Sequence, residues 1–434
     1  MALPPYRSKI VAAAERRAGQ GSFGDLGPGA LALEEWRALG LELPDLRALR
    51  AARLARLRAQ LAARDYAGIV LGDPINLRYA TDSANMQVWC LHNPVRYAFV
   101  ATEGPVILFD FHGCAHLSAH LALVDEVRPA RAWYFFNSGD RVMEHARLWA
   151  GEIAALLRAH GGGNRRLALD KADRDGVAAL EDEGIELHDG QEVMELARAL
   201  KSKDEIKAMR CAIATCEAAM AAMQAALRPG VTEQELWAHL HAENVKRGGE
   251  WIETRLLTSG PRTNPWFQEC GSRVIEAGDL VGFDTDLIGP YGYCADISRT
   301  WRCGQGRASA AQSELYRLAR EQLDHNLALV RPGLGLREFS EQAFRLPERY
   351  RANRYSVVAH GVGLCDEYPA VYYPEDFAPS GYDGVLEAGM TLCVESYVGE
   401  AGGREGVKLE QQLLVTAAGA ELLSRYPFED DAFS

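Results

Sequence analysis

Three aspartates lie close together in the segment FDTDLIGPYGYCADISRTW, residues 283 to 301. Asp284 and Asp286 are two residues apart, so on a β-strand their side chains would leave the same face. The residues GPYG are typical of a turn, after which Asp296 would return on the second strand of a hairpin. Carboxylates gathered in a largely apolar strand pair repel one another and resist desolvation unless a cation compensates them. The segment therefore predicts a metal site.

Three further residues of the C-terminal half could complete this site. His360 lies in VVAHGVGLCDEYP, Glu395 in MTLCVESYV and Glu410 in GVKLEQQLLVT. Both glutamates interrupt apolar, strand-like runs, where an unpaired carboxylate is costly. The five carboxylates carry about −5, and two divalent cations would offset about four of these charges, which predicts a dinuclear site. Oxygen and nitrogen ligands favour iron, manganese, cobalt or zinc over copper(I) or a cluster.

The elements that must position these residues fall into two predicted domains. Residues 1–30 are rich in Gly, Pro and Arg and predict an arm, and two amphipathic helices broken near Pro44 follow it. Short apolar runs then alternate with helical patterns up to about residue 195, which predicts an α/β domain. The charged run KSKDE at 201–205 opens a long helix. We therefore predict a boundary that divides the chain into 1–200 and 201–434.

The second domain is predicted to be α+β. Strand-like runs surround the proposed ligands, and helical patterns occupy about 308–330 and 336–347. The strands are short and separated by turn residues, which favours antiparallel sheets.

Composition excludes several classes of function. The 434 residues are 48% hydrophobic and 25% charged, as in ordinary globular proteins. The 47 basic and 60 acidic residues give a net charge of −13, without a basic block interleaved with aromatics, so no nucleic-acid partner is expected. No run approaches the ~18 apolar residues of a membrane span. The nine cysteines form no C-x-x-C pair, which suits reduced thiols in the cytoplasm.

The order of the proposed ligands resembles that of a known superfamily. The D-x9-D hairpin, the HGVG segment, the VE strand and the KLE strand are similar to those of the pita-bread metallohydrolases, which include methionine aminopeptidase, aminopeptidase P, prolidase and the metal-free creatinases. The junction KSKDEIKAMR and the phrases DISRTW and LEAGMTLCVE are similar too. The resemblance implies a creatinase-like α/β N-terminal domain followed by an α+β pita-bread domain.

Departures from the peptidase pattern change the expected chemistry. Peptidases of the superfamily carry a histidine after a proline where this chain has Trp266, and another where it has Asp366 and Glu367. Those histidines handle the scissile peptide and the tetrahedral intermediate. Their absence argues against peptide hydrolysis. An additional acid, Asp284, also precedes the usual first aspartate.

One branch is similar in all these respects, namely the dimethylsulfoniopropionate lyases of the DddP type. The runs DPINLRYATDSANMQVW, FDTDLIGPYGYCADISRTW and HGVGLCDEYP carry this likeness over nearly the whole chain. The likeness implies β-elimination of dimethylsulfoniopropionate to dimethyl sulfide and acrylate. It also implies two metal ions, with iron preferred over zinc, manganese, cobalt or nickel, and a homodimer in which one subunit's N-terminal domain helps to close the other's site.

The elimination needs a base and a place for a sulfonium cation. The base need only be a carboxylate beside the metals, and we predict Asp366, with Glu367 as the alternative. The resemblance marks Tyr355 as a substrate-binding residue. A sulfonium favours aromatic faces, so Trp266 and, more weakly, Trp89 are further candidates.

Other interpretations of the same residues stay open. The protein could be a hydrolase like prolidase or aminopeptidase P, or a non-catalytic pita-bread binding module. Asp366 and Glu367 could form a surface turn, and Trp266 and Tyr355 could be packing aromatics. Cys294 and Cys393 each precede a proposed ligand by two residues and would line the site rather than bind metal.

Overall fold

The computed structural model describes residues 27–434, whose contacts form two compact units. Residues 45–198 belong to unit 1, and residues 27–44 together with 199–434 belong to unit 2. The sequence-based division at 200/201 differs in assigning 27–44 to the first domain. The predicted arm at 1–30 lies outside the described residues except for its last few positions.

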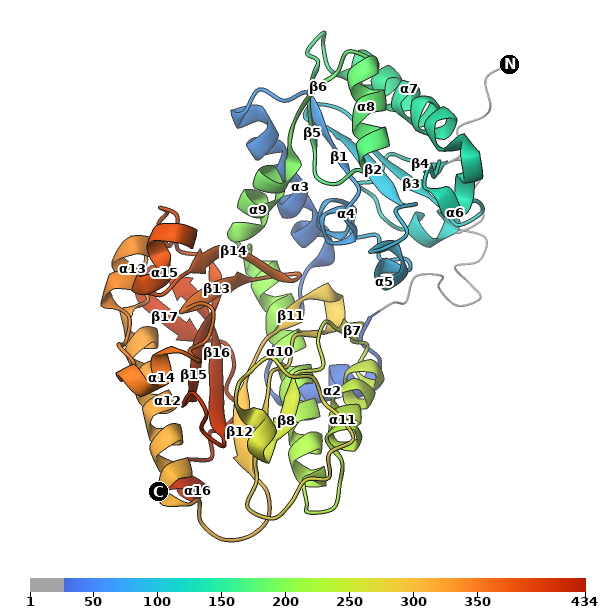
Figure 1. Ribbon diagram of the computed structural model, residues 1–434. Helices are drawn as coiled ribbons and strands as arrows, with labels where there is room; N and C mark the ends of the chain where they lie inside the picture. The colour runs from blue at the N-terminus through green and yellow to red at the C-terminus, as the bar shows by residue number, and fades with distance from the viewer. Residues whose placement is uncertain (1–26) are drawn as a thin grey trace. The chain divides into compact units, whose positions relative to one another are not determined.

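Unit 1 is built on a six-stranded mixed sheet with the order β4-β3-β2-β1-β5-β6 (Figure 1). Strands β1 to β3 pair antiparallel, whereas β3–β4, β1–β5 and β5–β6 pair parallel. β1, β2 and β3 are buried along their whole lengths, so both faces of the sheet are covered. The strands span Gly68–Leu71 (β1), Tyr97–Ala101 (β2), Val106–Asp110 (β3), Glu126–Pro129 (β4), Arg166–Leu169 (β5) and Glu186–Asp189 (β6).

Helices cover this sheet, and three of them begin at an aspartate cap. The side chains of Asp45, Asp73 and Asp173 accept hydrogen bonds from the free N–H groups at the starts of α3, α4 and α8. The α-helices are α3 (Leu46–Ala63), α4 (Pro74–Thr81), α5 (Gln87–Cys90), α6 (Phe135–Ser138), α7 (Val142–His160), α8 (Arg174–Asp182) and α9 (Gly190–Ala199). The α/β prediction for the first half is confirmed.

Helices of unit 2 flank three antiparallel sheets. Capping boxes at Ser202, Thr232 and Ser309 start its three longest helices, α10, α11 and α12. The helices are α2 (Ala30–Ala38), α10 (Lys203–Ala226), α11 (Glu233–Lys246), α12 (Ala310–Leu329), α13 (Leu336–Gln342), α14 (Glu348–Arg351), α15 (Pro374–Ser380) and α16 (Asp430–Phe433). The helices expected at about 308–330 and 336–347 are therefore present, the second being shorter.

The largest sheet of unit 2 has five strands in the order β14-β13-β15-β16-β17. They span Ala359–Val362 (β13), Asp366–Val371 (β14), Thr391–Gly399 (β15), Gly406–Thr416 (β16) and Gly419–Leu422 (β17). Two three-stranded sheets have the orders β11-β10-β7 and β12-β9-β8. Their strands are β7 (Trp251–Ile252), β8 (Leu257–Ser259), β9 (Leu280–Phe283), β10 (Leu287–Ile288), β11 (Cys294–Ala295) and β12 (Arg299–Arg302). These antiparallel sheets confirm the α+β prediction for the second half.

The aspartate hairpin forms, but not as a continuous pair of strands. β9 pairs with β12 and β10 with β11, around a 3-10 turn at Pro290–Gly292. Both strands are interrupted where the aspartates lie, and Asp286 has a left-handed backbone with φ 36°. The expectation that Asp284 and Asp286 share one face of a regular strand is therefore wrong. The three carboxylates nevertheless lie close together at this break, each with one oxygen within 4.8 Å of the others.

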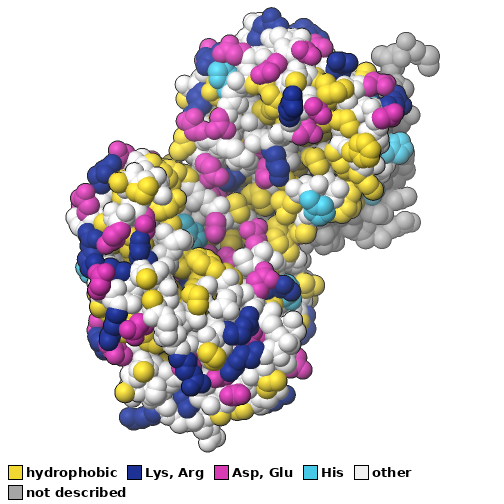
Figure 2. Space-filling view, viewed as in Figure 1, with side chains coloured by type: hydrophobic (Ala, Val, Ile, Leu, Met, Phe, Trp, Pro, Cys, Tyr) yellow, Lys and Arg dark blue, Asp and Glu magenta, His cyan; other side chains and the backbone are white. Residues whose placement is uncertain are grey.

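Two further observations concern hydropathy and charge. Among residues 27–434, no helix is both long enough and apolar enough to cross a membrane. Figure 2 shows basic and acidic side chains intermixed over the visible face of each unit.

Candidate metal centre

Three central strands of the five-stranded sheet bring an imidazole and two carboxylates together. Glu395 on β15 lies directly opposite Glu410 on β16, and both side chains are fully buried. Opposed residues of an antiparallel pair project from the same face. His360 on β13 pairs with Cys393 of β15, and a register shift follows it. Its Nε2 lies 3.2 Å from Glu395 Oε1.

The broken hairpin supplies the remaining carboxylates. Asp284, Asp286 and Asp296 each offer one oxygen within a group whose members lie within 4.8 Å of one another. Asp296 also belongs to a second such group, with His360, Cys393 and Glu410. The structure therefore gathers the six predicted ligands at one place in unit 2. Asp296 is common to both groups.

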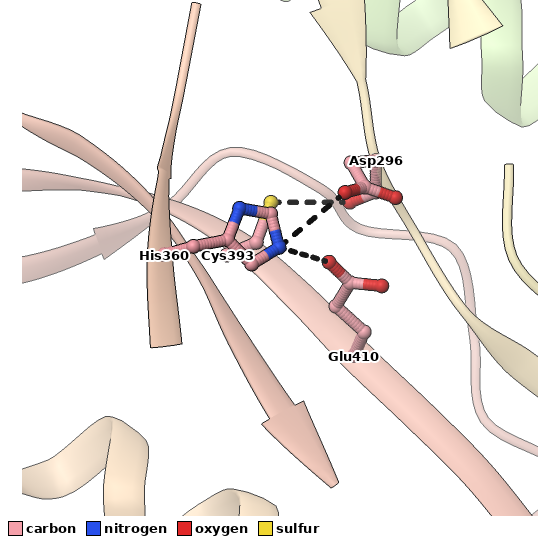
Figure 3. A group of neighbouring side chains, drawn as sticks. All are labelled: Asp296, His360, Cys393 and Glu410. Atoms are coloured by element: carbon pink, nitrogen blue, oxygen red, sulfur yellow. Dashed lines mark hydrogen bonds and ion pairs between the residues drawn. The ribbon is translucent and has the colours of Figure 1, made fainter. Parts of the chain in front are cut away.

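His360 is oriented with one ring nitrogen toward the carboxylates (Figure 3). Its Nδ1 lies 3.0 Å from the Gly361 carbonyl, which can only accept a hydrogen bond, so this nitrogen carries a proton. Nε2 faces Asp296 Oδ2 at 3.6 Å and Glu410 Oε1 at 3.9 Å. An imidazole held in this way presents the Nε2 lone pair to a metal.

Two buried carboxylate oxygens without a hydrogen-bond partner show that this cluster suits a cation. Asp296 Oδ1 and Glu410 Oε1 are buried and have no hydrogen-bond partner among the described residues. Burial, reinforced by neighbouring carboxylates, raises the pKa of both side chains well above the usual value. Buried acceptors that repel one another and lack donors fit a divalent ion bound between them.

Cys393 joins the second group through its thiol. It lies on β15, and its Sγ is 3.6 Å from the Asp296 carbonyl. Burial and nearby carboxylates raise the pKa of this thiol well above its usual value, which disfavours the thiolate that binds metals. The predicted role of lining the site stays the better interpretation.

Lys408 is part of the site although sequence reasoning did not single it out. The side chain is fully buried on β16, two residues before Glu410. Its Nζ lies 2.6 Å from Glu395 Oε2 and 3.1 Å from both Asp284 Oδ2 and Glu410 Oε2. Positions two apart on a strand share a face, so the KLE spacing was a signal that could have found it.

The two candidate bases lie in different surroundings. Asp366 begins β14, its side chain is 57% exposed, and its Oδ1 lies 3.6 Å from His360 Nδ1. Glu367 points elsewhere, because adjacent strand residues face opposite sides, and its buried carboxylate pairs with Lys201. The alternative that these two residues form a surface turn is wrong.

The candidate aromatic residues separate into two places. Tyr355 and Trp266 lie with their rings 4.5 Å and 5.9 Å from Lys408 Nζ, beside the carboxylates. Phe267 stacks on Tyr355 with ring centroids 5.2 Å apart, a contact that the sequence did not indicate. The Phe267 residue is 56% exposed. Trp89 is in unit 1, where it packs against Phe111.

Comparison with known proteins identifies the family. The chain is 47% identical over 410 residues to dimethylsulfoniopropionate lyase DddP of Roseovarius nubinhibens, which covers 93% of this chain and 92% of the relative. The DddP protein of Roseobacter denitrificans is 46% identical over the same shares. The chain belongs to the DddP family. The sequence-based resemblance is confirmed. Residues 207–417 also match Metallopeptidase family M24.

Solved structures establish the fold that this chain shares with peptidases. The Xaa-Pro dipeptidase from Bacillus anthracis aligns with a TM-score of 0.70 at 23% identity, covering 87% of this chain and 98% of that one. Prolidase from Pyrococcus horikoshii aligns with a TM-score of 0.67 at 20% identity, covering 87% and 99%. The predicted α/β domain followed by a pita-bread domain is thereby confirmed.

Proposed function

We propose that this protein is a metal-dependent lyase that cleaves dimethylsulfoniopropionate to dimethyl sulfide and acrylate. The observation that carries the proposal is a half-exposed carboxylate, Asp366, beside His360 of a buried ligand cluster in a DddP-family chain. Metallopeptidases of the superfamily have a histidine at this position. A carboxylate there suits removal of a proton from carbon rather than handling of a peptide bond.

The reaction balances without a redox partner. The base takes the proton α to the substrate carboxylate, and the electrons of that C–H bond form the double bond of acrylate. The β carbon–sulfur bond breaks, and its electron pair leaves with sulfur. The sulfonium thereby becomes neutral dimethyl sulfide.

Six residues are proposed to hold the metal ions: Asp284, Asp286, Asp296, His360, Glu395 and Glu410. Bound there, a divalent cation supplies a Lewis acid that binds the substrate carboxylate and stabilises the charge that develops as the α proton leaves. Metallopeptidase family M24, which residues 207–417 match, is one of metal-binding proteins. We propose two ions, with iron as the first candidate before zinc, manganese, cobalt or nickel.

Asp366 is the proposed proton acceptor. Desolvation by the surrounding protein raises the pKa of Asp366, and the carboxylates of Asp284 and Glu395 raise it further. His360 opposes this shift but does not cancel it. A raised pKa makes the carboxylate a stronger base. Glu367 is a weaker candidate because its ion pair with Lys201 holds it away from His360.

The sulfonium is proposed to lie against the aromatic residues beside the cluster. Tyr355 and Trp266 border Lys408, and Phe267 extends this wall to the surface. Aromatic faces attract a sulfonium through the ring quadrupole. Trp89 belongs to unit 1, and its predicted role as a weaker substrate contact stays a prediction.

We also propose a cytoplasmic homodimer. All nine cysteines are free thiols, as expected in a reducing compartment. The dimer rests on the resemblance to the DddP lyases, which implies that one subunit's N-terminal domain would help to close the other's site.

The test is detection of dimethyl sulfide in the headspace, with acrylate measured by NMR, for wild type and Asp366→Asn reconstituted with Fe(II) under anaerobic conditions. We expect wild type to release both products and Asp366→Asn to lose at least ~100-fold in kcat, the usual size of a general-base effect. Asp383→Asn, an exposed carboxyl paired with Arg337 in the same unit, should retain wild-type activity.

The outcomes separate the two parts of the proposal. A metal-replete wild type that releases no dimethyl sulfide sinks the lyase assignment, whatever the variants do. Full activity of Asp366→Asn removes only the base assignment, and the same loss in Glu367→Gln but not in Asp366→Asn would transfer the role to Glu367. Hydrolysis of an X-Pro dipeptide by wild type would favour the peptidase alternative.

A further inference from the structure

Asn264 lies just before the aromatic residues that are proposed to bind the sulfonium. The residue is buried, and its side-chain amide joins two distant segments of unit 2 to its own. Its Nδ2 donates to the carbonyls of Glu400 at 2.8 Å and Gly403 at 2.9 Å. Its Oδ1 accepts from Asn353 Nδ2 at 2.9 Å. Because carbonyls only accept hydrogen bonds, both hydrogens of the amide are used in these contacts.

The contact with Asn353 joins the two halves of the aromatic wall. Trp266 and Phe267 follow Asn264 by two and three residues, and Tyr355 follows Asn353 by two. The rings of Phe267 and Tyr355 stack with their centroids 5.2 Å apart. The hydrogen bond between the two asparagines therefore links, close to the rings, the two segments whose rings meet.

The contacts with Glu400 and Gly403 connect the wall to the hairpin of β15 and β16. Both residues lie in the loop of this hairpin, and its paired strands carry Glu395 and Glu410. A substrate with a sulfonium at one end and a carboxylate at the other must reach both the wall and the metal-binding carboxylates. The amide of Asn264 therefore helps to fix the distance between the two places that such a substrate would occupy.

The packing around this amide is close on the side of β15 as well. A Cβ atom at Gly399 would lie 2.6 Å from Asn264 Oδ1 and 2.5 Å from the Tyr397 hydroxyl, so a larger residue there would have to displace them. The Tyr397 hydroxyl lies 2.9 Å from the same amide oxygen, and its ring packs against Trp266 with centroids 5.9 Å apart. The amide is thus enclosed by residues that also contact the wall.

We propose that Asn264 is a positioning residue for substrate binding. Its hydrogen bonds to Glu400, Gly403 and Asn353, here called the Asn264 clamp, hold the aromatic wall at a set distance from the metal-binding carboxylates. Asn264 acts through the aromatic rings and not on the reacting atoms. Without the amide, the loop carbonyls lose a donor and the two segments of the wall lose their link. This inference rests on the proposed lyase function and adds a residue that determines substrate affinity.

The kinetic test compares Asn264→Ala with Asn326→Ala, each reconstituted with Fe(II). Asn326 is also a buried asparagine of unit 2, but its Oδ1 accepts from the Phe344 N–H, outside the clamp. We expect Asn264→Ala to raise KM for dimethylsulfoniopropionate by ~5-fold or more and to change kcat by less than ~3-fold, because contacts of the sulfonium weaken alike in the ground state and the transition state. Asn326→Ala should lose stability and keep the wild-type KM.

Hydrogen exchange followed by mass spectrometry tests the clamp without the reaction. Peptides that cover 263–269 and 352–358 should exchange faster in Asn264→Ala than in wild type, and at the wild-type rate in Asn326→Ala. Gly399→Ala reaches the same amide from β15 and should cause the same changes with Asn264 intact. If Asn264→Ala does not fold by circular dichroism, Asn353→Ala provides the measurement, since it removes one contact at a half-buried position and should raise KM by less.

The outcomes separate the clamp from the proposed function. Unchanged exchange of both segments in Asn264→Ala would overturn the clamp. Faster exchange with a wild-type KM would overturn its role in substrate binding, as would an equal rise of KM in Asn326→Ala. A wild type that releases no dimethyl sulfide would defeat the proposed function instead, and the exchange rates would still decide whether Asn264 holds the wall.

Discussion

Phe267 is an exposed aromatic residue that belongs to the wall proposed to bind the sulfonium. More than half of it is exposed, and its ring stacks on Tyr355 next to the carboxylate cluster. It has a left-handed backbone with φ 66°, which is uncommon for an aromatic residue. Strained positions of this kind occur where a side chain has a functional placement.

Phe267→Leu should therefore weaken binding of the sulfonium. Removal of one aromatic face costs ~0.5–2 kcal/mol, so we expect KM for dimethylsulfoniopropionate to rise between ~2- and ~30-fold with little change in kcat. Steady-state kinetics by headspace detection provide the measurement. Val245→Leu, at another exposed apolar position of unit 2, serves as the control. An unchanged KM would remove Phe267 from the proposed aromatic wall.

At the scale of elements, Asp170 joins two neighbouring strands of unit 1, β1 and β5, to a helix. It follows β5, and its carboxylate accepts hydrogen bonds from the N–H of Gly72, after β1, and from Asn76 Nδ2 in α4. Burial raises the pKa of Asp170 to about 7, against the opposing effect of these donors.

This pKa predicts a pH dependence of stability. Because the folded state holds the Asp170 proton up to about pH 7, while the unfolded chain releases it near the ordinary aspartate pKa of 3.8, stability falls as pH rises between these values. The maximum slope for one group is ~1.4 kcal/mol per pH unit. Above pH 7 this contribution no longer changes.

Urea unfolding of wild type and Asp170→Asn from pH 5 to pH 8 checks this expectation. The difference in unfolding free energy between the two proteins should change steadily up to about pH 7, because the variant lacks the titrating group. Asp189→Asn removes an exposed carboxyl of the same unit and should follow wild type. A difference that is constant over this range would contradict the raised pKa.

At the scale of the whole molecule, the ligands of the proposed centre come from distant segments of unit 2. Asp296 lies between β11 and β12, His360 is on β13 and Glu410 is on β16. A metal ion bound to all three would cross-link these segments in the folded state alone. Folding and metal binding should therefore be coupled.

Metal loading should raise the thermal stability of the protein. A ligand that binds only the folded state at 100 times its Kd adds ~2.7 kcal/mol. We expect the unfolding transition of unit 2, followed by calorimetry, to move upward when Mn(II) is added to chelator-treated wild type. Glu410→Gln should respond much less. A transition that stays in place while Mn(II) is bound would argue against this coupling.

Local patterns in the sequence were sufficient for much of the architecture. The long helix expected from 201–205, the helix expected at about 308–330 and the GPYG turn all form, because helix starts and turns depend on a few neighbouring residues. The ligand order from Asp286 to Glu410 predicted the pita-bread superfamily, and longer runs such as FDTDLIGPYGYCADISRTW predicted the DddP family. The comparisons confirm both.

Tertiary structure alone decided how these residues meet. The left-handed backbone at Asp286 interrupts the regular strand expected there. On β14, alternate side chains face opposite sides, so Asp366 contacts His360 and Glu367 contacts Lys201. The KLE spacing places Lys408 and Glu410 on one strand face, but only the folded structure brings the Lys408 ammonium between carboxylates of three segments. The chain by itself determined which chemistry-bearing residues exist and in which order. Several of their pairings, such as those of Lys408 with Ser298 and Asp284, join segments more than a hundred residues apart, because strand register and burial are set by the folded core.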